Sequence, residues 1–166
     1  MLRRVLIGKK NTIYLCNKLF IKAMKITIGG SMTFAKEQLE ASRFLQERGY
    51  EIFLTEDINH FIEKPEIKDD AIKSLELSIQ YDVIREFFDK IANSDAYLVC
   101  NYEKNGIKGY LGASVLMEIG LAYYLKKKIY LLFDIDHEQK YAHEIDIIKP
   151  VVLNGEKTDI LNYLEN

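Results

Sequence analysis

One carboxylate, that of Glu118, stands out in an otherwise apolar helical stretch that runs on into an apolar strand. On a helical wheel it lies beside the apolar stripe, which consists of Val115, Leu116, Ile119, Ala122 and Tyr123. Small residues, among them Gly112 and Ser114, precede Glu118 and leave space for a ligand. A half-buried carboxylate there can act as a nucleophile or a base. An ordinary boundary glutamate paired with Lys108 or Lys104 is the alternative.

A second candidate is the segment IGGSM, in which Gly29, Gly30, Ser31 and Met32 follow a short β-branched run and precede a predicted helix. Glycine N–H groups at such a turn can approach an anion, and the helix N-terminus adds partial positive charge. We therefore expect these four residues to bind substrate, in particular a phosphate. The alternative is a tight strand-to-helix turn with an N-cap, because neither GxxxxGK[ST] nor GxGxxG occurs.

Charged residues also line one face of a predicted helix, opposite an apolar stripe formed by Ile84, Phe87, Phe88 and Ile91. The charged face carries Asp82, Arg85, Glu86 and Asp89. In a parallel α/β fold the helices run antiparallel to the strands, so Asp82 lies nearer the ligand-binding edge. Asp89 lies about 10 Å further along at 1.5 Å per residue. Asp82 is therefore the better candidate for an acid, and a solvated charged face is the alternative.

Strand and helix patterns alternate from Met24 onward. Short, nearly continuous apolar runs predict strands at 25–30, 51–54, 95–101, 127–133 and 149–155. Helices are predicted between the first four strands and at the C-terminus, whereas 134–149 has a mixed pattern. The polar segment 55–70 around Pro65 is predicted to be a loop or lid. This alternation predicts an α/β fold with a single doubly wound, mostly parallel five-stranded sheet. We expect the flavodoxin- or Rossmann-like order 2-1-3-4-5.

Ligands of such a fold bind at the carboxyl ends of the strands. That rule places the candidate rim at 29–31, 55–57, 101–112 and 134–137, and it adds Asn101 to the predicted substrate-binding residues. Asp134, Asp136 and His137 have the chemistry of metal ligands, but a hydrogen-bonded turn explains them as well. We expect neither a metal nor a cofactor.

Composition narrows the classes of partner. The 166 residues carry a formal net charge of −2, yet residues 1–23 hold six Lys or Arg and no acid, which leaves −8 on residues 24–166. An acidic body repels a phosphate backbone, so extended nucleic acid is not expected as a partner. No apolar window reaches the roughly 18 residues of a membrane span. Two distant cysteines, Cys16 and Cys100, favour a reducing compartment, and we expect a cytoplasmic protein with a basic extension, 1–23, before one domain, 24–166.

Three motifs together resemble a known family. They are GGS at 29–31, SDAYLV at 94–99, and Glu118-Ile119-Gly120-Leu121-Ala122, followed by a basic turn and a strand. Across residues 24–133 this order is similar to the nucleoside 2-deoxyribosyltransferases and the related 2′-deoxynucleoside 5′-monophosphate N-glycosidases. The family's nucleophile corresponds to Glu118, and GGS corresponds to the loop that helps to hold the 5′-phosphate. The family's catalytic aspartate falls on Phe87 by an ungapped count, so Asp82 or Asp89 would have to take its role.

The resemblance implies an N-glycosidase or deoxyribosyltransferase acting on a (deoxy)nucleoside or its 5′-monophosphate. Glu118 would attack the anomeric carbon, and water or a second base would resolve the glycosyl ester. Relatives complete their sites across a dimer interface, and the aromatic residues Phe87, Phe88, Tyr123 and Tyr124 offer surface for a homodimer. Two alternatives stay open: a catalytically silent nucleotide-binding or sensing module on the same fold, and a flavodoxin-like signalling or electron-transfer domain.

Overall fold

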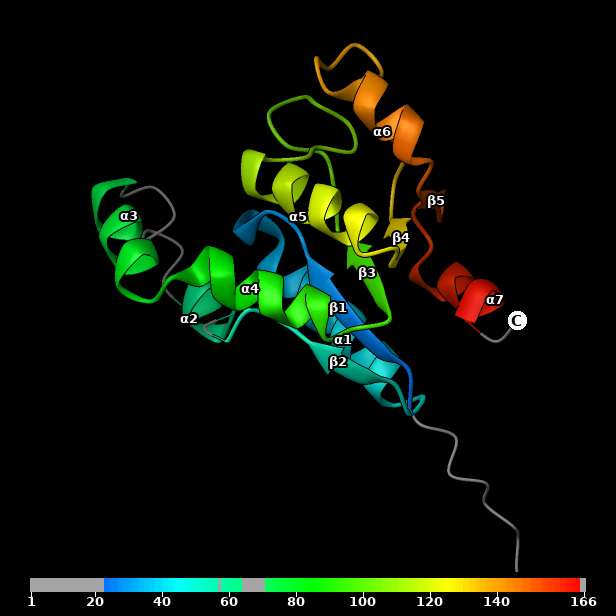
Figure 1. The fold of residues 1–166 in the computed structure, drawn as a ribbon, viewed down its shortest axis with the longest axis horizontal. Helices are drawn as coiled ribbons and strands as arrows, with labels where there is room; N and C mark the ends of the chain where they lie inside the picture. The colour runs from blue at the N-terminus through cyan, green and yellow to red at the C-terminus, as the bar shows by residue number, and fades with distance from the viewer. Residues whose placement is uncertain (1–22, 57, 64–70, 165–166) are drawn as a thin grey trace, which may run out of the picture.

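The computed structural model describes residues 23–56, 58–63 and 71–164. The predicted basic extension therefore lies outside the described residues, except for Ala23. Within these ranges the chain folds as a parallel sheet with helices on both faces (Figure 1).

The sheet has five strands, β1 (Lys25–Gly29), β2 (Glu51–Phe53), β3 (Ala96–Val99), β4 (Lys128–Leu131) and β5 (Val151–Val152). Their order is β2-β1-β3-β4-β5, and every pair is parallel. The predicted order 2-1-3-4-5 is confirmed. Because Gly29 pairs with Val99 and Val99 with Leu131, the carboxyl ends of the three central strands reach the same edge of the sheet.

A hydrophobic core covers each face of the sheet, and successive residues of a strand point alternately into one core and the other. Ile26 and Ile28 face α1 (Ala35–Gln46), which contributes Ala41 and Leu45. On the opposite face Tyr97 and Val99 belong to a core that also includes residues of three helices, α4 (Val83–Ala92), α5 (Ala113–Tyr124) and α6 (Ala142–Ile148). Figure 1 shows α4 and α5 side by side in front of the sheet and α1 behind it.

Five further elements complete the described chain. The 3-10 helix η1 (Met32–Phe34) precedes α1, and η3 (Lys157–Ile160) leads into α7 (Leu161–Leu164). Between β2 and α4 lie α2 (Ile58–Glu63) and α3 (Ala71–Gln80). The prediction that 55–70 is a loop is therefore wrong at 58–63, where the apolar Ile58 is buried, and the rest of that segment is partly outside the described residues.

The four aromatic residues predicted to offer surface for a homodimer differ in their exposure. Tyr123 and Tyr124 are exposed, so the placement of Tyr123 in the apolar stripe of its helix is wrong. Phe87 is only 7% exposed and belongs to the core, and Phe88 is half-buried. The exposed pair of aromatic residues therefore lies at the end of α5, and Phe87 is not part of the surface.

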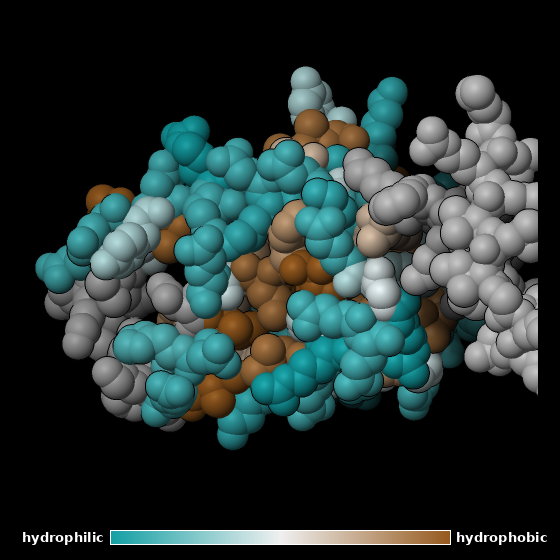
Figure 2. Space-filling model, turned by 90° about the horizontal axis from the view of Figure 1, so that it is seen from below, coloured by the Kyte–Doolittle hydropathy of each residue, from teal (hydrophilic) through white to brown (hydrophobic). Residues whose placement is uncertain are grey.

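The edge formed by β2 is short, with three paired residues. Viewed from that side, the surface is mainly hydrophilic and has an apolar area in its middle (Figure 2). A short edge strand offers few unpaired backbone groups to another chain. Among the described helices, none has the length and hydrophobicity that crossing a membrane requires.

Candidate active site

The Glu118 side chain lies half-buried in the second turn of α5, where it meets β3. The hydroxyl of Tyr97 donates a hydrogen bond to its Oε2. The lysines that were the alternative partners do not pair with it: the ammonium of Lys104 bonds elsewhere, to the Ser31 hydroxyl, and Lys108 is exposed. Among the described residues, Glu118 is therefore held by a neutral phenol and not by a cation.

Gly29, at the end of β1, makes the approach of Tyr97 possible. A Cβ on Gly29 would lie 2.5 Å from the Tyr97 hydroxyl oxygen and 3.0 Å from Cζ of Phe87. The two rings also contact each other edge to face, with centroids 6.3 Å apart. The absence of a side chain at Gly29 thus leaves the space in which the phenol reaches Glu118, so Gly29 and Glu118 lie at one end of the sheet.

Burial sets the protonation of this pair. It raises the pKa of Glu118 from 4.5 to about 7, and the hydrogen bond from Tyr97 opposes part of that rise. Burial, together with the Glu118 charge, also raises the pKa of Tyr97 well above its ordinary value. Near neutral pH Tyr97 therefore stays a hydrogen-bond donor, while Glu118 is divided between its acid and its carboxylate.

The loop after β1 forms a second polar cluster next to this pair. Ser31 caps η1, and its hydroxyl accepts a hydrogen bond of 3.1 Å from Nζ of Lys104, which comes from the loop after β3. The same ammonium lies 5.2 Å from the ring centroid of Tyr110. A hydroxyl and an ammonium at the end of a glycine turn are suited to an anion.

Gly30 fixes the path of that loop. Its φ is +148°, and a Cβ there would lie 2.7 Å from the carbonyl oxygen of Cys100. The amide nitrogen of Gln38, buried in α1, donates to the carbonyl of Ser31 at 3.0 Å, while no described residue donates a hydrogen bond to its Oε1. The glycine turn is thus supported from behind by α1.

Three other residues predicted to bind substrate, Met32, Gly112 and Ser114, are close in sequence to these two clusters. Gly112 is the N-cap of α5, and Ser114 is exposed in its first turn. Ser114 precedes Glu118 by four residues, so both are on the same helix face. Met32 is half-buried in η1, directly after Ser31.

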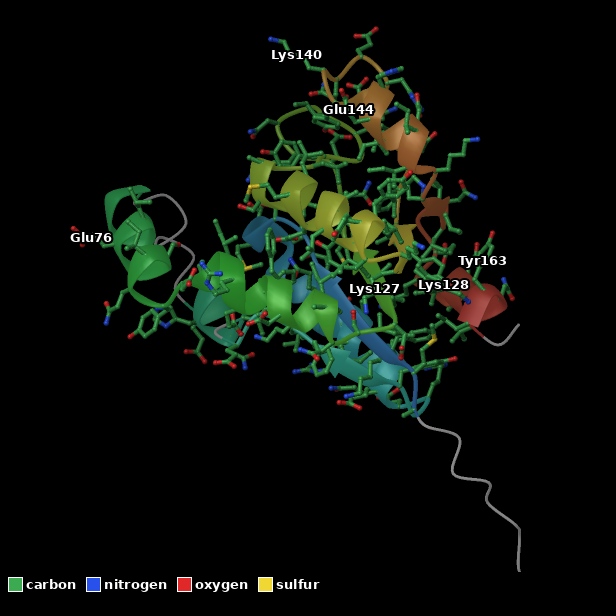
Figure 3. The ribbon with its side chains drawn as sticks, viewed as in Figure 1. Glu76, Lys127, Lys128, Lys140, Glu144 and Tyr163 are labelled. Carbon is green, nitrogen blue, oxygen red and sulfur yellow. The ribbon has the colours of Figure 1, made fainter. Side chains whose placement is uncertain are left out.

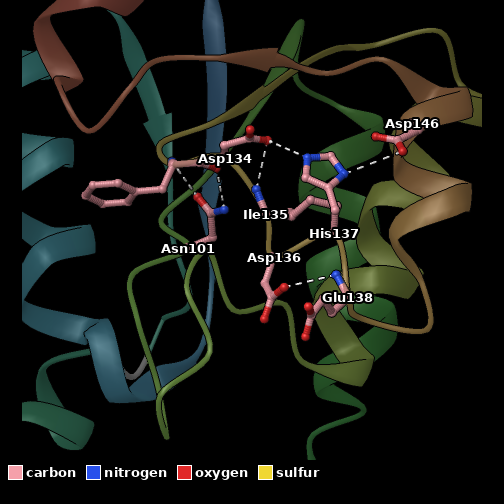
Figure 4. Close-up of polar contacts among 8 residues, drawn as sticks. Asn101, Asp134, Ile135, Asp136, His137, Glu138 and Asp146 are labelled. Atoms are coloured by element: carbon pink, nitrogen blue, oxygen red, sulfur yellow. Dashed lines mark hydrogen bonds and ion pairs between the residues drawn. The ribbon is translucent and has the colours of Figure 1, made fainter.

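Asn101 is bonded within the fold (Figure 4). Its amide nitrogen donates to the carbonyl of Phe133 at 2.7 Å, and its amide oxygen accepts from the Phe133 N–H at 2.9 Å. Both ends of the side chain thus join the loops that follow β3 and β4. This arrangement accounts for a buried asparagine without a ligand.

The acidic turn after β4 is also internally paired (Figure 4). His137 lies 3.6 Å from a carboxylate oxygen of Asp134 and 3.6 Å from one of Asp146, on α6. Asp136 accepts from the N–H of Glu138 at 2.9 Å. The turn residues therefore connect β4 to α6, as the hydrogen-bonded alternative predicts.

The helical acids lie in solvent. Asp82 is the N-cap of α4, with a φ of 44°, and its carboxylate is paired with Arg85 at 2.7 Å. Asp89 is exposed further along the same helix. Phe87, where the family places its aspartate, packs against Tyr97 instead.

Two contacts of this site were not predicted. The sequence places Tyr97 only in a buried strand, because it shows which residues alternate but not which face of the strand meets Glu118. The sequence suggests Lys104 only as a partner of Glu118. Its spacing from Gly106 and Gly109 indicates a folded-back loop, which the Lys104–Ile107 bridge confirms, and this signal could have directed Lys104 toward the β1 loop.

No protein-family model matches the chain, and no curated protein matches it. Among solved structures, the chain is similar to the Clostridium botulinum CMP N-glycosidase BcmB. That alignment covers 85% of this chain and 97% of the other, with 15% identity and a TM-score of 0.46.

Proposed function

We propose that this chain is an N-glycosidase that cleaves the base–sugar bond of a (deoxy)nucleoside or its 5′-monophosphate, with Glu118 as the nucleophile. One observation carries the proposal: a carboxyl group whose pKa is about 7 lies near the carboxyl end of the sheet, oriented by Tyr97. A carboxylate with one oxygen fixed by a hydrogen bond has its other oxygen available for attack.

The proposed reaction has two displacements. The free oxygen of Glu118 bonds to the anomeric carbon as the bond to the base breaks, and the base leaves with the bonding electrons and gains a proton. Water then attacks the same carbon, releases the Glu118 carboxylate and yields the free sugar with retained configuration. A second base in place of water would make the enzyme a transferase.

The environment of Glu118 suits an oxocarbenium-like transition state. A partly desolvated carboxylate interacts more strongly with developing positive charge than one in water does. The Tyr97 hydrogen bond lowers the pKa of Glu118, so it preserves a population of the reactive anion at neutral pH. The tyrosine is therefore a positioning residue in this mechanism.

A 5′-phosphate is proposed to bind between the glycine turn and the loop after β3. Ser31 and Lys104 supply a hydroxyl and a cation there, 3.1 Å apart, and Gly30 exposes backbone close to them. The substrate-binding role of Met32, Gly112 and Ser114 is part of the same proposal. Asn101 would act through the backbone of Phe133 that it holds.

Asp82 is the proposed proton donor to the leaving base. It precedes α4, whose N-terminal end lies toward the ligand-binding edge, because the helix runs antiparallel to the strands. Its pairing with exposed Arg85 would have to open when substrate binds.

A homodimer is the proposed assembly. Ile84 of α4 and Met117 of α5 are 47% and 45% exposed, near the N-terminal ends of two adjacent helices. Large apolar side chains on that side, next to Glu118 in sequence, would be covered by a second copy. A mass of only about 19 kDa in sedimentation at high concentration would remove this part of the proposal.

A nucleotide-binding module without catalysis is the second candidate. It is favoured by Phe87, an apolar ring at the position where the family has its catalytic aspartate. The discriminating experiment incubates the protein with nucleosides and their 5′-monophosphates, with and without an acceptor base, and separates the products by chromatography. Release of free base supports the glycosidase. Binding without release supports the module.

A further inference from the structure

A groove of about 840 Å³ lies away from Glu118, at the opposite edge of the sheet. It is formed by the C-terminal end of α5, the turn into β4, the segment between α6 and β5, and α7. Its lining includes tyrosines and lysines, among them Tyr123, Tyr124, Lys126, Lys128, Lys149 and Tyr163. We call this hollow the tyrosine–lysine groove.

The groove is separate from the proposed active site. Tyr124 follows Glu118 by six residues, which is about 9 Å along the helix. Lys128 begins β4, whereas the Glu118 cluster lies where β1 ends. A ligand in the groove would therefore contact the amino ends of the strands and not the glycine turn.

Lysines give the groove its charge. Four of them line it, at 126, 127, 128 and 149, and no Asp or Glu of the described chain is among the lining residues. One has a structural role: Nζ of Lys127 donates to the carbonyls of Ala92 and Ser94, at 2.7 and 2.6 Å, and so caps the end of α4. The other three need a separate explanation.

Capping of α5 does not explain Lys126. The carbonyls of Leu121, Ala122 and Tyr123 are already bonded to backbone N–H groups of residues 125–127. Lys126 and Lys149 are exposed, and within the described ranges neither forms an ion pair. Both have left-handed backbones, with φ of 56° and 54°, where glycine is the favoured residue. A lysine at each place adds a cation to the groove.

The tyrosines give the groove flat apolar walls. Tyr124 is 80% exposed, Tyr123 52% and Tyr163 44%. The Tyr163 ring is held by Tyr130 beneath it, with centroids 6.1 Å apart, and Nζ of Lys128 donates to the Tyr163 carbonyl at 3.4 Å. Figure 3 shows Lys128 and Tyr163 together beside α7. Exposed tyrosine faces beside lysine ammoniums can stack a base and bind phosphate in one ligand.

We propose that the tyrosine–lysine groove is a second nucleotide site, which takes a nucleoside polyphosphate with its base against the tyrosines and its phosphates on Lys126 and Lys149. The volume lies within the usual range for small-molecule sites, about 300–1,000 Å³. The positive lining is complementary to the negative charge of a polyphosphate. This site does not depend on the proposed glycosidase activity.

The test is titration of the full-length protein with ATP, followed by calorimetry and by amide chemical shifts. We expect saturable binding, with shift changes at residues 123–128 and 149. The double variant Lys126→Gln/Lys149→Gln should weaken it by about tenfold or more. The control Lys36→Gln/Lys140→Gln removes the same charge from exposed lysines outside the groove and should bind as the wild type does. Tyr124→Ala should weaken ATP but not inorganic triphosphate.

Three results overturn the proposal. Shift changes confined to residues 29–32 place ATP at the Glu118 site alone. Equal binding of ATP and inorganic triphosphate, unaffected by Tyr124→Ala, shows a site for charge and not for a nucleotide. Absence of ATP binding, with a concentration-dependent mass that Tyr124→Ala lowers, shows that a second copy of the chain covers the groove.

Discussion

The Tyr97 hydroxyl, on β3, donates a hydrogen bond to Oε2 of Glu118, on α5. Gly29 leaves the space for this contact, because a Cβ there would lie 2.5 Å from the phenol oxygen. The contact joins a central strand to the helix that covers it and fixes one of the two carboxylate oxygens. It also gives the protonation of Glu118 a defined partner, which can be tested by substitution.

The activity should depend on pH through Glu118. Because the attacking species is the anion and its pKa is about 7, kcat/KM should rise with pH through that value. Tyr97→Phe removes the hydrogen bond that lowers this pKa, so the rise should move to higher pH. The check is a pH profile of kcat/KM. Tyr130→Phe, a buried tyrosine of the opposite core, is the control and should leave the profile in place.

The free energy of unfolding should fall as pH rises through the pKa of Glu118, whereas the activity should rise. The pKa of Glu118 is raised in the folded state, so the folded state binds this proton more tightly than the unfolded state does. The resulting stabilisation is complete below pH 4.5 and is lost as pH rises through about 7. The shift corresponds to about 3 kcal/mol. Glu118→Gln stays neutral, so its stability relative to the wild type should increase by roughly that amount between about pH 5 and about pH 8, as measured by urea unfolding. A constant difference would mean that Glu118 is not desolvated.

Lys104 should matter only for phosphorylated substrates. Lys104→Met removes the cation beside Ser31 and should raise KM for a 5′-monophosphate by about tenfold or more, because hydrogen bonds to charged groups contribute about 1.5–3 kcal/mol. KM for the corresponding nucleoside should not change. Lys108→Met, at an exposed lysine of the same loop, provides the matched control. Equal effects on both substrates would place the phosphate elsewhere.

Asp82 and Asp89 offer a paired test of the proton donor. Asp82→Asn should slow turnover most for bases that leave poorly without a proton, and Asp89→Asn should have a smaller effect because it lies further from the ligand-binding edge. Both residues are exposed, so the folded state should tolerate either change. Rates on substrates with different leaving bases provide the measurement. Unchanged rates for Asp82→Asn would leave the reaction without an assigned acid.

The sequence predicted the sheet well because its strands are short apolar runs between helical patterns. Strand order and the position of α5 followed from that alternation, and the structure confirms the order. It did not predict α2, whose six residues follow a polar segment, or α3, where the apolar Leu75 and Ile79 are exposed. The exposure of Tyr123 was missed because a helical wheel shows spacing but not where the covering sheet ends.

The sequence predicts which segments form the candidate site, but not which side chains contact one another there. Glycines that end a strand mark the turn at 29–31, and a carboxylate in an apolar helix marks Glu118. The partner of Glu118 depends on which residue of β3 faces α5, and the partner of Ser31 depends on the path of the loop after β3. Both are tertiary relationships, so Tyr97 and Lys104 emerge only from the folded chain.

The most direct test of the central claim is the rate of free-base release by Glu118→Gln, on a nucleoside or 5′-monophosphate that the wild type cleaves. The amide keeps the size of the side chain and can still bond to Tyr97, but it cannot attack the anomeric carbon. The rate should fall by orders of magnitude while substrate binding is retained, and Glu144→Gln, at an exposed glutamate on α6, should behave as the wild type does. Release at the wild-type rate by Glu118→Gln would contradict the nucleophilic role of Glu118.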